Sequence, residues 1–418
     1  MSAPAATQEP ARRPQPPALR GNRDFKLLWA GAGFSFIGSR ISIIAYPMLV
    51  LAYSGSASDA GLVGFCANLP YVLQLVAGGL VDRLDRRRLM IACDIGRLAA
   101  TGSLVAALAF GHFWLAQVAA VAFTESSLTI LYRISERAAV RHVVRATDLP
   151  AALSGNEARE RAAGLLGQPV GSLLFALLRW APLVCTLAAN AVSLVMLLLI
   201  RARMQGDRAA TRSGGFVKEL WAGIAWAWRQ PFVRVLAGLI AGTNMLFAGL
   251  SLALQYIVRH GGGSDGEVGF TIGLIFTLSG VGGTLGALTA KWWMKRASLS
   301  AVVIGCNVAW AVLMPQVAYA RGPVTLGALF AGMGYAGALW NVAAAVYQMK
   351  VTPEEMQGRV LSVATLVAYG TVPFGSLAGG FLLDHFGPRT TVLGLGGAMC
   401  LLALTAAASP SVRRLQTA

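Results

Sequence analysis

Twelve apolar runs, each long enough to form a membrane-spanning helix, occupy most of this sequence. A helix needs about 20 predominantly apolar residues to cross a bilayer. A transmembrane β-barrel would instead show shorter segments of alternating polarity. We therefore expect an all-α membrane protein with twelve transmembrane helices. The runs lie at 26–52, 58–81, 88–110, 113–134, 149–178, 180–200, 232–258, 268–290, 298–319, 323–349, 358–383 and 388–408.

The low content of charged residues indicates that the protein lies in a membrane. Only 13% of the 418 residues are charged, whereas a soluble domain is nearer a quarter charged. A net charge of +17 would indicate nucleic-acid binding in a soluble protein. Here, however, the arginines stand mostly in short connections between apolar runs, where they set the topology. We expect the lipid bilayer as a partner and no nucleic acid.

The distribution of basic residues predicts an orientation. Alternate connections on one side carry most of the lysines and arginines, and the other side has only Arg179, Arg259, Arg321 and Arg389 near its connections. Because basic residues are retained inside, both termini should be cytoplasmic in the inner or plasma membrane. The first run is too long for a cleavable signal peptide, and we expect it to remain as the first helix.

The chain divides into two similar halves. "PVGSL" begins at Pro169 and "PFGSL" at Pro373, an offset of 204 residues, and Gly78 and Gly286 each precede a basic cluster at an offset of 208. Internal repeats of this kind are typical of secondary transporters. The predicted parts are a disordered cytoplasmic tail (1–22), a six-helix bundle (23–200), a cytoplasmic linker (201–231), a second six-helix bundle (232–409) and a short cytoplasmic tail (410–418).

No motif for catalysis, metal binding or nucleotide hydrolysis is present. The sequence has no GxxxxGK[ST] phosphate-binding loop, no HExxH, and no cysteine pair with metal or redox spacing. We therefore expect no metal site, no cofactor and no enzymatic activity.

A charged cluster between the second and third runs identifies a resemblance. It matches the signature Gly-x-x-x-Asp-Arg-x-Gly-Arg-Arg of the major facilitator superfamily, with Asp85 at the second glycine, through Gly78, Asp82, Arg83, Arg86 and Arg87. "GLLGQPVGSLL", "TPEEMQGRVLS" and "PFGSLAGGFLLDHFG" resemble the branch containing the enterobactin exporter and macrolide efflux proteins. The resemblance implies the major facilitator fold: two pseudo-symmetric six-helix bundles around a central cavity, with alternating access.

The same resemblance implies a conformational gate. In this superfamily the signature loop clasps the cytoplasmic end of the eleventh helix, so Asp82 should lie near Arg359 in the first turn of that helix. A carboxylate at a helix N-terminus is stabilised by the helix dipole. Together with Gly78, Arg83, Arg86 and Arg87, this contact would favour the outward-facing state, because it exists only when the cytoplasmic side is closed.

Two charges deep in the bilayer are candidates for proton coupling. Charged side chains within the membrane are costly and usually functional. From a rise of about 1.5 Å per residue, Glu125 should lie about 12 Å and Arg40 about 20 Å above the inner edge. We expect them to form an ion pair that breaks on protonation, or alternatively a static pair that fixes packing. Asp94 and Arg97, one turn apart, form either a structural pair or a second proton site.

The second bundle should supply the substrate cavity. It has no acidic residue in its membrane interior, and family geometry turns its seventh and tenth helices toward the cavity. Apolar walls with a few polar groups suit an amphipathic organic ligand. The candidate contacts are Asn244, Tyr335, Trp340 and Asn341.

These features favour a monomeric secondary transporter that exports an amphipathic small molecule in exchange for protons. An antibiotic, a siderophore or another secondary metabolite would fit. A proton-coupled nutrient importer is the main alternative, although the lack of carboxylates in the second half disfavours it. A membrane receptor or scaffold is a further alternative, but it would not need Arg40 and Glu125 in the membrane core.

Overall fold

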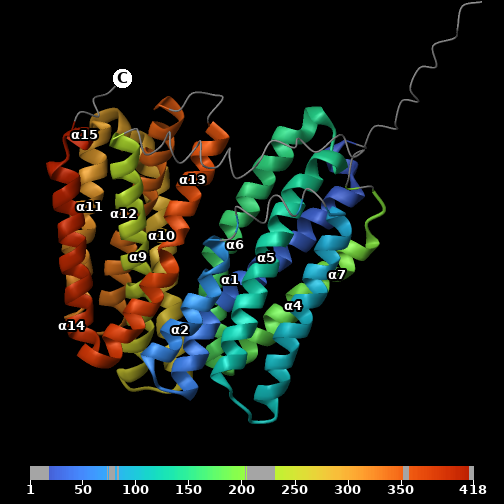
Figure 1. Cartoon of the computed structure of the whole chain (residues 1–418), viewed down its shortest axis with the longest axis horizontal. Coiled ribbons are helices and arrows are strands. Elements are labelled where there is room, and N and C mark those ends of the chain that lie inside the picture. The colour runs from blue at the N-terminus through green and yellow to red at the C-terminus, as the bar shows by residue number, and fades with distance from the viewer. Residues whose placement is uncertain are drawn as a thin grey trace, which may run out of the picture.

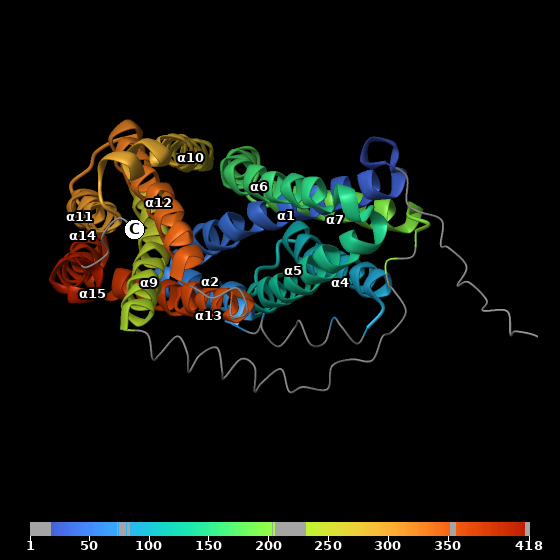
Figure 2. The same cartoon turned by 90° about the horizontal axis from the view of Figure 1, so that it is seen from above.

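The computed structural model describes residues 18–72, 74, 81, 84–202, 204, 231–351 and 357–413, and all regular elements within them are helical. Figures 1 and 2 show two groups of helices lying side by side. The first group contains η1 (Leu19–Gly21), α1 (Arg23–Tyr53), α2 (Ala57–Asn68), α4 (Arg86–Ala109), α5 (Leu115–Val143), η2 (Ala146–Asp148), α6 (Leu149–Leu177) and α7 (Ala181–Leu199). The second contains α9 (Pro231–His260), α10 (Asp265–Arg296), α11 (Leu299–Gln316), α12 (Pro323–Val351), α13 (Gln357–Gly370), α14 (Val372–Ala408) and α15 (Pro410–Arg413).

Nine helical stretches among the described residues are long and apolar enough to cross a membrane. The helix α6 is not among them, and it carries four charged residues within five positions (Glu157 to Arg161). The helix α14 contains the second part of the span predicted at 358–383 and the whole of the span predicted at 388–408, and Gly387, with a φ of 76°, turns the chain between them just before Pro388. The chain is therefore a multi-pass helical membrane protein, and the exact count of twelve spans stays a prediction.

The eleventh predicted helix differs from expectation. The sequence predicts one helix over 358–383, but the structure has α13 and α14 separated at Thr371. Pro373 stands in the first turn of α14, where a residue without an N–H is tolerated but would break a helix interior. The Thr371 hydroxyl donates to the carbonyl of Ala241 on α9 at 2.7 Å, which fixes the break against a neighbouring helix.

The internal repeat appears in the packing. Gly171 of the first PxGS motif packs on Ile41 and Ile44 of α1, and Gly375 of the second packs on Met245 of α9. Each motif thus lies against the first helix of its own bundle.

The serine that follows each of these glycines reaches the other bundle. A Cβ on Gly269 of α10 would lie 2.5 Å from the carbonyl oxygen of Ser172, and one on Gly61 of α2 would lie 2.6 Å from that of Ser376. Only glycine allows such close approach, so the two motifs make equivalent contacts across the molecule. The halves are related as the sequence predicts.

The two bundles meet at one end of the molecule. We call the end where α1 begins and α15 lies the terminal end, and the opposite end, with residues 54–56 and 261–264, the far end. In Figure 1 the bundles converge at the far end and separate toward the terminal end. Most of the described contacts between them are made by α2 with α14 and by α6 with α10, and α9 also contacts α1 and α2. A cavity lies farther toward the terminal end.

Candidate functional site

A cavity of about 710 Å³ lies between the two bundles. Its two walls differ in chemistry. The first bundle supplies a polar and basic wall, formed by Arg40, Ile43, Asn68, Tyr71, Arg133 and Gln168. The second bundle supplies a larger wall with six aromatic residues: Phe247, Phe276, Trp310, Phe330, Trp340 and Tyr369. A volume of this size and an apolar wall with a few polar groups match a small-molecule site.

Aromatic side chains in the second wall support one another. Trp310 makes edge-to-face contacts with Phe247 and Trp340, with ring centroids 5.5 and 6.1 Å apart. The Trp310 indole N–H donates to the carbonyl of Met333 at 3.0 Å. Such contacts hold the rings in place before any ligand arrives. The two tryptophans are almost fully buried, so they fix the position of the more exposed Phe247 ring in the wall.

Three of the four cavity residues predicted from sequence line this cavity. Asn244, Trp340 and Asn341 face it, and the Asn244 amide also donates to the carbonyl of Ala368 at 2.6 Å. Tyr335 is a correction. Its hydroxyl accepts a hydrogen bond from the Trp293 indole at 2.7 Å, so its side chain is directed toward α10 and away from the cavity.

Glu125 lies in a small side pocket next to the cavity. It is 2% exposed, it accepts a hydrogen bond from the Tyr46 hydroxyl, and its Oε1 has no hydrogen-bond partner among the described residues. Ile43 and Tyr71 line both this pocket and the central cavity. The carboxyl group therefore stands one layer of side chains behind the cavity surface.

The predicted ion pair between Glu125 and Arg40 is absent in this conformation, although both residues are described. Their order in height is also the reverse of the prediction. Glu125 contacts Tyr46, whereas Ser39 contacts Thr129 at 3.1 Å, which puts Arg40 about one turn nearer the terminal end than Glu125. The predicted heights were obtained by counting residues from an assumed membrane edge. The edge was misplaced because α5, with 29 residues, is longer than a bilayer core requires.

Asp94 and Arg97 form a fully buried ion pair inside the first bundle. The Ser193 hydroxyl donates to Asp94 at 2.8 Å, and Arg97 donates to the Ser35 hydroxyl at 2.6 Å. These bonds tie α4 to α7 and α1. Neither residue lines the cavity, so the geometry supports the structural alternative for this pair.

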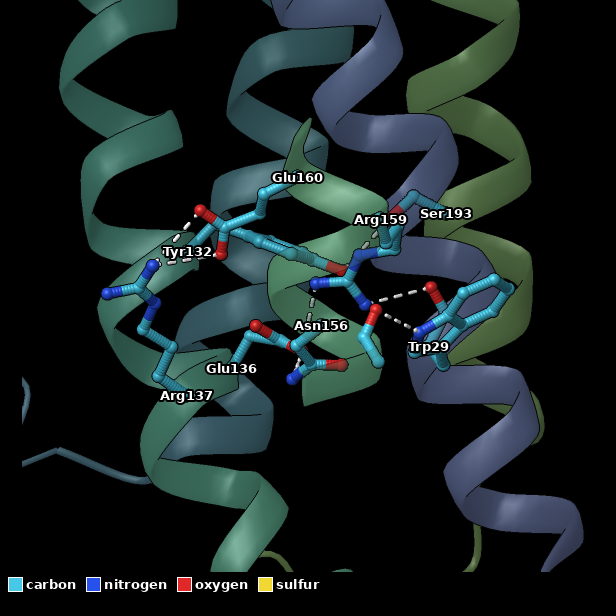
Figure 3. A network of polar contacts seen from close by, with 9 residues as sticks. Trp29, Tyr132, Glu136, Arg137, Asn156, Arg159, Glu160 and Ser193 are labelled. Carbon is cyan, nitrogen blue, oxygen red and sulfur yellow. Dashed lines mark hydrogen bonds and ion pairs between the residues drawn. The ribbon is translucent and has the colours of Figure 1, made fainter. Parts of the chain in front are cut away.

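A second buried ion pair was not predicted from sequence. Glu136 of α5 accepts from Arg159 of α6 at 3.3 Å and from Asn156 at 3.0 Å, and Arg159 also donates to the carbonyl of Trp29 at 3.0 Å (Figure 3). Glu136 and Arg159 are 0% and 6% exposed. Burial in a low dielectric makes such a pair sensitive to the loss of either partner. It joins α1, α5 and α6 near the terminal end.

The far end is closed by charged contacts that cross between the bundles. The Asp384 carboxylate on α14 accepts from the Ser56 hydroxyl at 2.9 Å and from the backbone N–H groups of Ala57 and Ser58 at 2.9 and 2.7 Å. It therefore caps the N-terminus of α2, where the helix dipole favours a negative charge.

A cluster of three charges makes a second contact at the far end. Asp265 at the start of α10 pairs with Arg179, 2.5 Å away, and with Arg259. Arg179 follows α6 in the first bundle, so the cluster also joins the two halves. The sequence analysis placed Arg179 and Arg259 at the outer side, but no local pattern indicated that Arg179 pairs with Asp265, 86 residues away.

Part of the predicted gate lies among the described residues. Gly78, Asp82 and Arg83 lie outside the described residues, as does the side chain of Arg359 in α13. Arg87 donates to the carbonyl of Leu198 at 3.1 Å near the C-terminus of α7, and Arg86 donates to the carbonyl of Ala138 at 3.4 Å. Asp85, the departure from the signature, caps α4 by accepting from the backbone N–H of Arg88 at 2.9 Å. The gate stays a prediction.

The chain is similar to known proteins over most of its length. The sequence profile of the Major Facilitator Superfamily matches residues 28–370. The multidrug efflux pump Tap of Mycolicibacterium fortuitum is 29% identical over 415 residues, which cover 94% of this chain and 96% of that protein. Macrolide efflux protein A of Streptococcus pyogenes is 25% identical over 405 residues, covering 94% and 97%.

Solved structures show the same fold at low sequence identity. The nucleoside transporter NupG superposes with a TM-score of 0.71 at 15% identity, covering 93% of this chain and 98% of that protein. A bacterial homologue of the lysosomal transporter Spinster, in an inward-facing and unoccupied conformation, superposes with a TM-score of 0.72 at 13% identity, covering 96% and 99%. Identities this low inform about the fold alone.

Proposed function

This chain belongs to the Major Facilitator Superfamily, and we propose that it exports an amphipathic small molecule across the cell membrane by proton-driven alternating access. The observation that carries the proposal is the likeness over 94% of the chain to a multidrug efflux pump. The family consists of transporters, and we further propose that this chain acts as a monomer and has no enzymatic activity.

The arrangement of the bundles supports alternating access. The cavity is closed at the far end by the contact of Asp384 of α14 with the N-terminus of α2 and by the Asp265 cluster. The basic residues of the sequence favour a cytoplasmic terminal end. With that orientation the conformation described here is closed to the outside, and a substrate enters from the cytoplasm.

Glu125 supports proton coupling. An ionised carboxylate at this depth needs a counter-charge, whereas a protonated one does not. Arg40 lies about one turn away on the helix that also carries Tyr46. We propose that Glu125 is protonated and deprotonated during the cycle and that Arg40 is its partner in the ionised state. In the static alternative Glu125 only fixes the packing, as in its hydrogen bond with Tyr46, and another group carries the proton.

An efflux assay tests the proposal. Cells that lack their major drug exporters would express this chain and be loaded in turn with ethidium, rhodamine 123 and carboxyfluorescein. Export of at least one probe should stop when a protonophore collapses the proton gradient while ATP is maintained. Export that continues at the full rate under a protonophore would exclude proton coupling.

A glycine pair supplies a matched control for alternating access. Gly61→Leu should prevent closure of the far end, because even a Cβ there would lie 2.6 Å from the Ser376 carbonyl oxygen. Gly164→Leu changes a helical glycine that has no neighbour within 4 Å and should leave export intact. Equal export by the two variants would contradict the proposed closed state.

A further inference from the structure

The central cavity is basic. Arg40 on α1 and Arg133 on α5 both line it, and no acidic side chain is among the described residues of its walls. Ser39 contacts Thr129 at 3.1 Å, so Arg40 stands level with Thr129, and Arg133 lies one helical turn, about 6 Å, farther along α5. Two guanidinium groups therefore face the same space on one wall.

Neither arginine has a carboxylate partner among the described residues. Arg133 donates to the Gln74 amide oxygen at 3.0 Å, a neutral acceptor that positions the guanidinium without neutralising it. No ion pair of Arg40 is present in the described part of the chain. A charge in the membrane interior is costly unless it is paired or faces water. The cavity therefore holds two positive charges that a ligand could neutralise.

The deep acidic residues that the structure describes are engaged elsewhere. Within the first bundle, Asp94 and Glu136 are fully buried against Arg97 and Arg159. Glu125 is separated from the cavity by Ile43 and Tyr71. The sequence of 73–80 contains no acidic residue. The second bundle has none in its membrane interior.

We propose that the cavity selects anions: amphipathic molecules whose carboxylate, sulfonate or phosphate is bound by Arg40 and Arg133 and whose planar apolar part packs on Phe247, Phe276 and Tyr369. Guanidinium groups bind such oxyanions through paired hydrogen bonds, and aromatic rings bind planar groups by stacking. A cationic molecule of the same shape would face two like charges. The inference rests on the proposed function in one respect, namely that this cavity is the transport site.

Binding of two dyes with a shared ring system tests the charge preference. Carboxyfluorescein is anionic and rhodamine 123 is cationic, and both contain a xanthene ring. Fluorescence polarisation would measure their binding to the purified full-length protein in phosphatidylcholine nanodiscs, where the added dye is the only amphipathic anion. We expect the wild-type protein to bind carboxyfluorescein more tightly than rhodamine 123.

Variants of Arg40 and Arg133 test whether these two residues bind the anion. Arg40→Gln and Arg133→Gln should each weaken carboxyfluorescein binding by roughly tenfold or more, the effect of losing a charge-assisted hydrogen bond. Neither should weaken rhodamine 123 binding. Arg161→Gln is the matched control, because the Arg161 side chain is 75% exposed and pairs with Glu157 outside the cavity. Size-exclusion profiles would show that each variant is folded, and the two cavity variants serve as independent tests.

Three results would overturn the inference: no binding of carboxyfluorescein, equal or tighter binding of rhodamine 123, or full affinity for carboxyfluorescein in both cavity variants. The efflux assay separates this failure from failure of the proposed function. Proton-dependent export of rhodamine 123 without anion binding would leave the function standing and refute anion selectivity. Anion binding that depends on Arg40 and Arg133, without export of any dye, would support anion selectivity and refute the proposed export function.

Discussion

Replacing Asp384 by asparagine should open the far end of the transporter. In the structure the two carboxylate oxygens accept three hydrogen bonds from Ser56, Ala57 and Ser58, at the N-terminus of a helix in the other bundle. These contacts can exist only while the far end is closed. Asp384→Asn removes the negative charge and leaves one oxygen as an acceptor, so it weakens the closed state without changing the size of the side chain.

The magnitude follows from those contacts. The interaction of a surface charge with a helix dipole contributes about 0.3–1 kcal/mol. A hydrogen bond to a charged group contributes about 1.5–3 kcal/mol, against about 1 for a neutral one. Because Asp384 is exposed to solvent, we take the lower values and expect a loss of about 1–2 kcal/mol. That loss corresponds to a shift of roughly 5–30-fold toward the state that is open at the far end.

Distances between spin labels at the far end would measure the shift. Phe110 at the end of α4 and Val324 at the start of α12 are 80% and 71% exposed and lie in different bundles. Each would be replaced by cysteine and labelled in a variant without the five native cysteines. Electron–electron resonance distances should then show a larger population of long distances for Asp384→Asn.

Asp59→Asn provides the control. Asp59 is an acid in the same first turn of α2, and among the described residues its carboxylate forms no hydrogen bond or ion pair with the second bundle. An identical distance distribution for wild type and Asp384→Asn would refute the reasoning. An equal shift in both variants would assign the effect to the charge of the helix terminus alone and not to the contact between bundles.

Three further changes have defined outcomes. Asp82→Asn should abolish most transport while leaving expression and membrane insertion intact, and transport at the wild-type rate would contradict the gate that the signature implies. Glu125→Gln mimics the protonated acid, so substrate binding should become nearly independent of pH between about 5.5 and 8.5 while uphill pumping fails; pumping with wild-type pH dependence would place the proton elsewhere. Glu136→Gln leaves Arg159 buried without a counter-charge and should reduce the free energy of unfolding by about 3–5 kcal/mol, whereas Glu157→Gln, which breaks an exposed pair, should cost at most about 1 kcal/mol. Melting temperatures compare the two, and equal shifts would contradict the structural role of the buried pair.

The sequence by itself determined the class of fold and its division into halves. Apolar runs of about 20 residues can only be stable as helices in a bilayer, since no water is present there to satisfy the backbone. The PxGS repeat identified the duplication, and the structure confirms it in the equivalent contacts of Ser172 with Gly269 and of Ser376 with Gly61. Asp94 and Arg97 could be paired because they are one turn apart on the same helix.

Only the tertiary structure decided which side chains face the cavity and which charges meet. In a membrane protein the lipid-facing and core-facing sides of a helix are both apolar, so periodicity does not reveal the direction of a residue. Trp340 and Tyr335 are five residues apart on α12, yet one lines the cavity and the other bonds to α10. Tyr46 bonds to Glu125, and Asp384 to Ser58, because helix tilt and length bring them to one level. Such contacts join residues 79 and 326 positions apart, and no local pattern in the sequence specifies them.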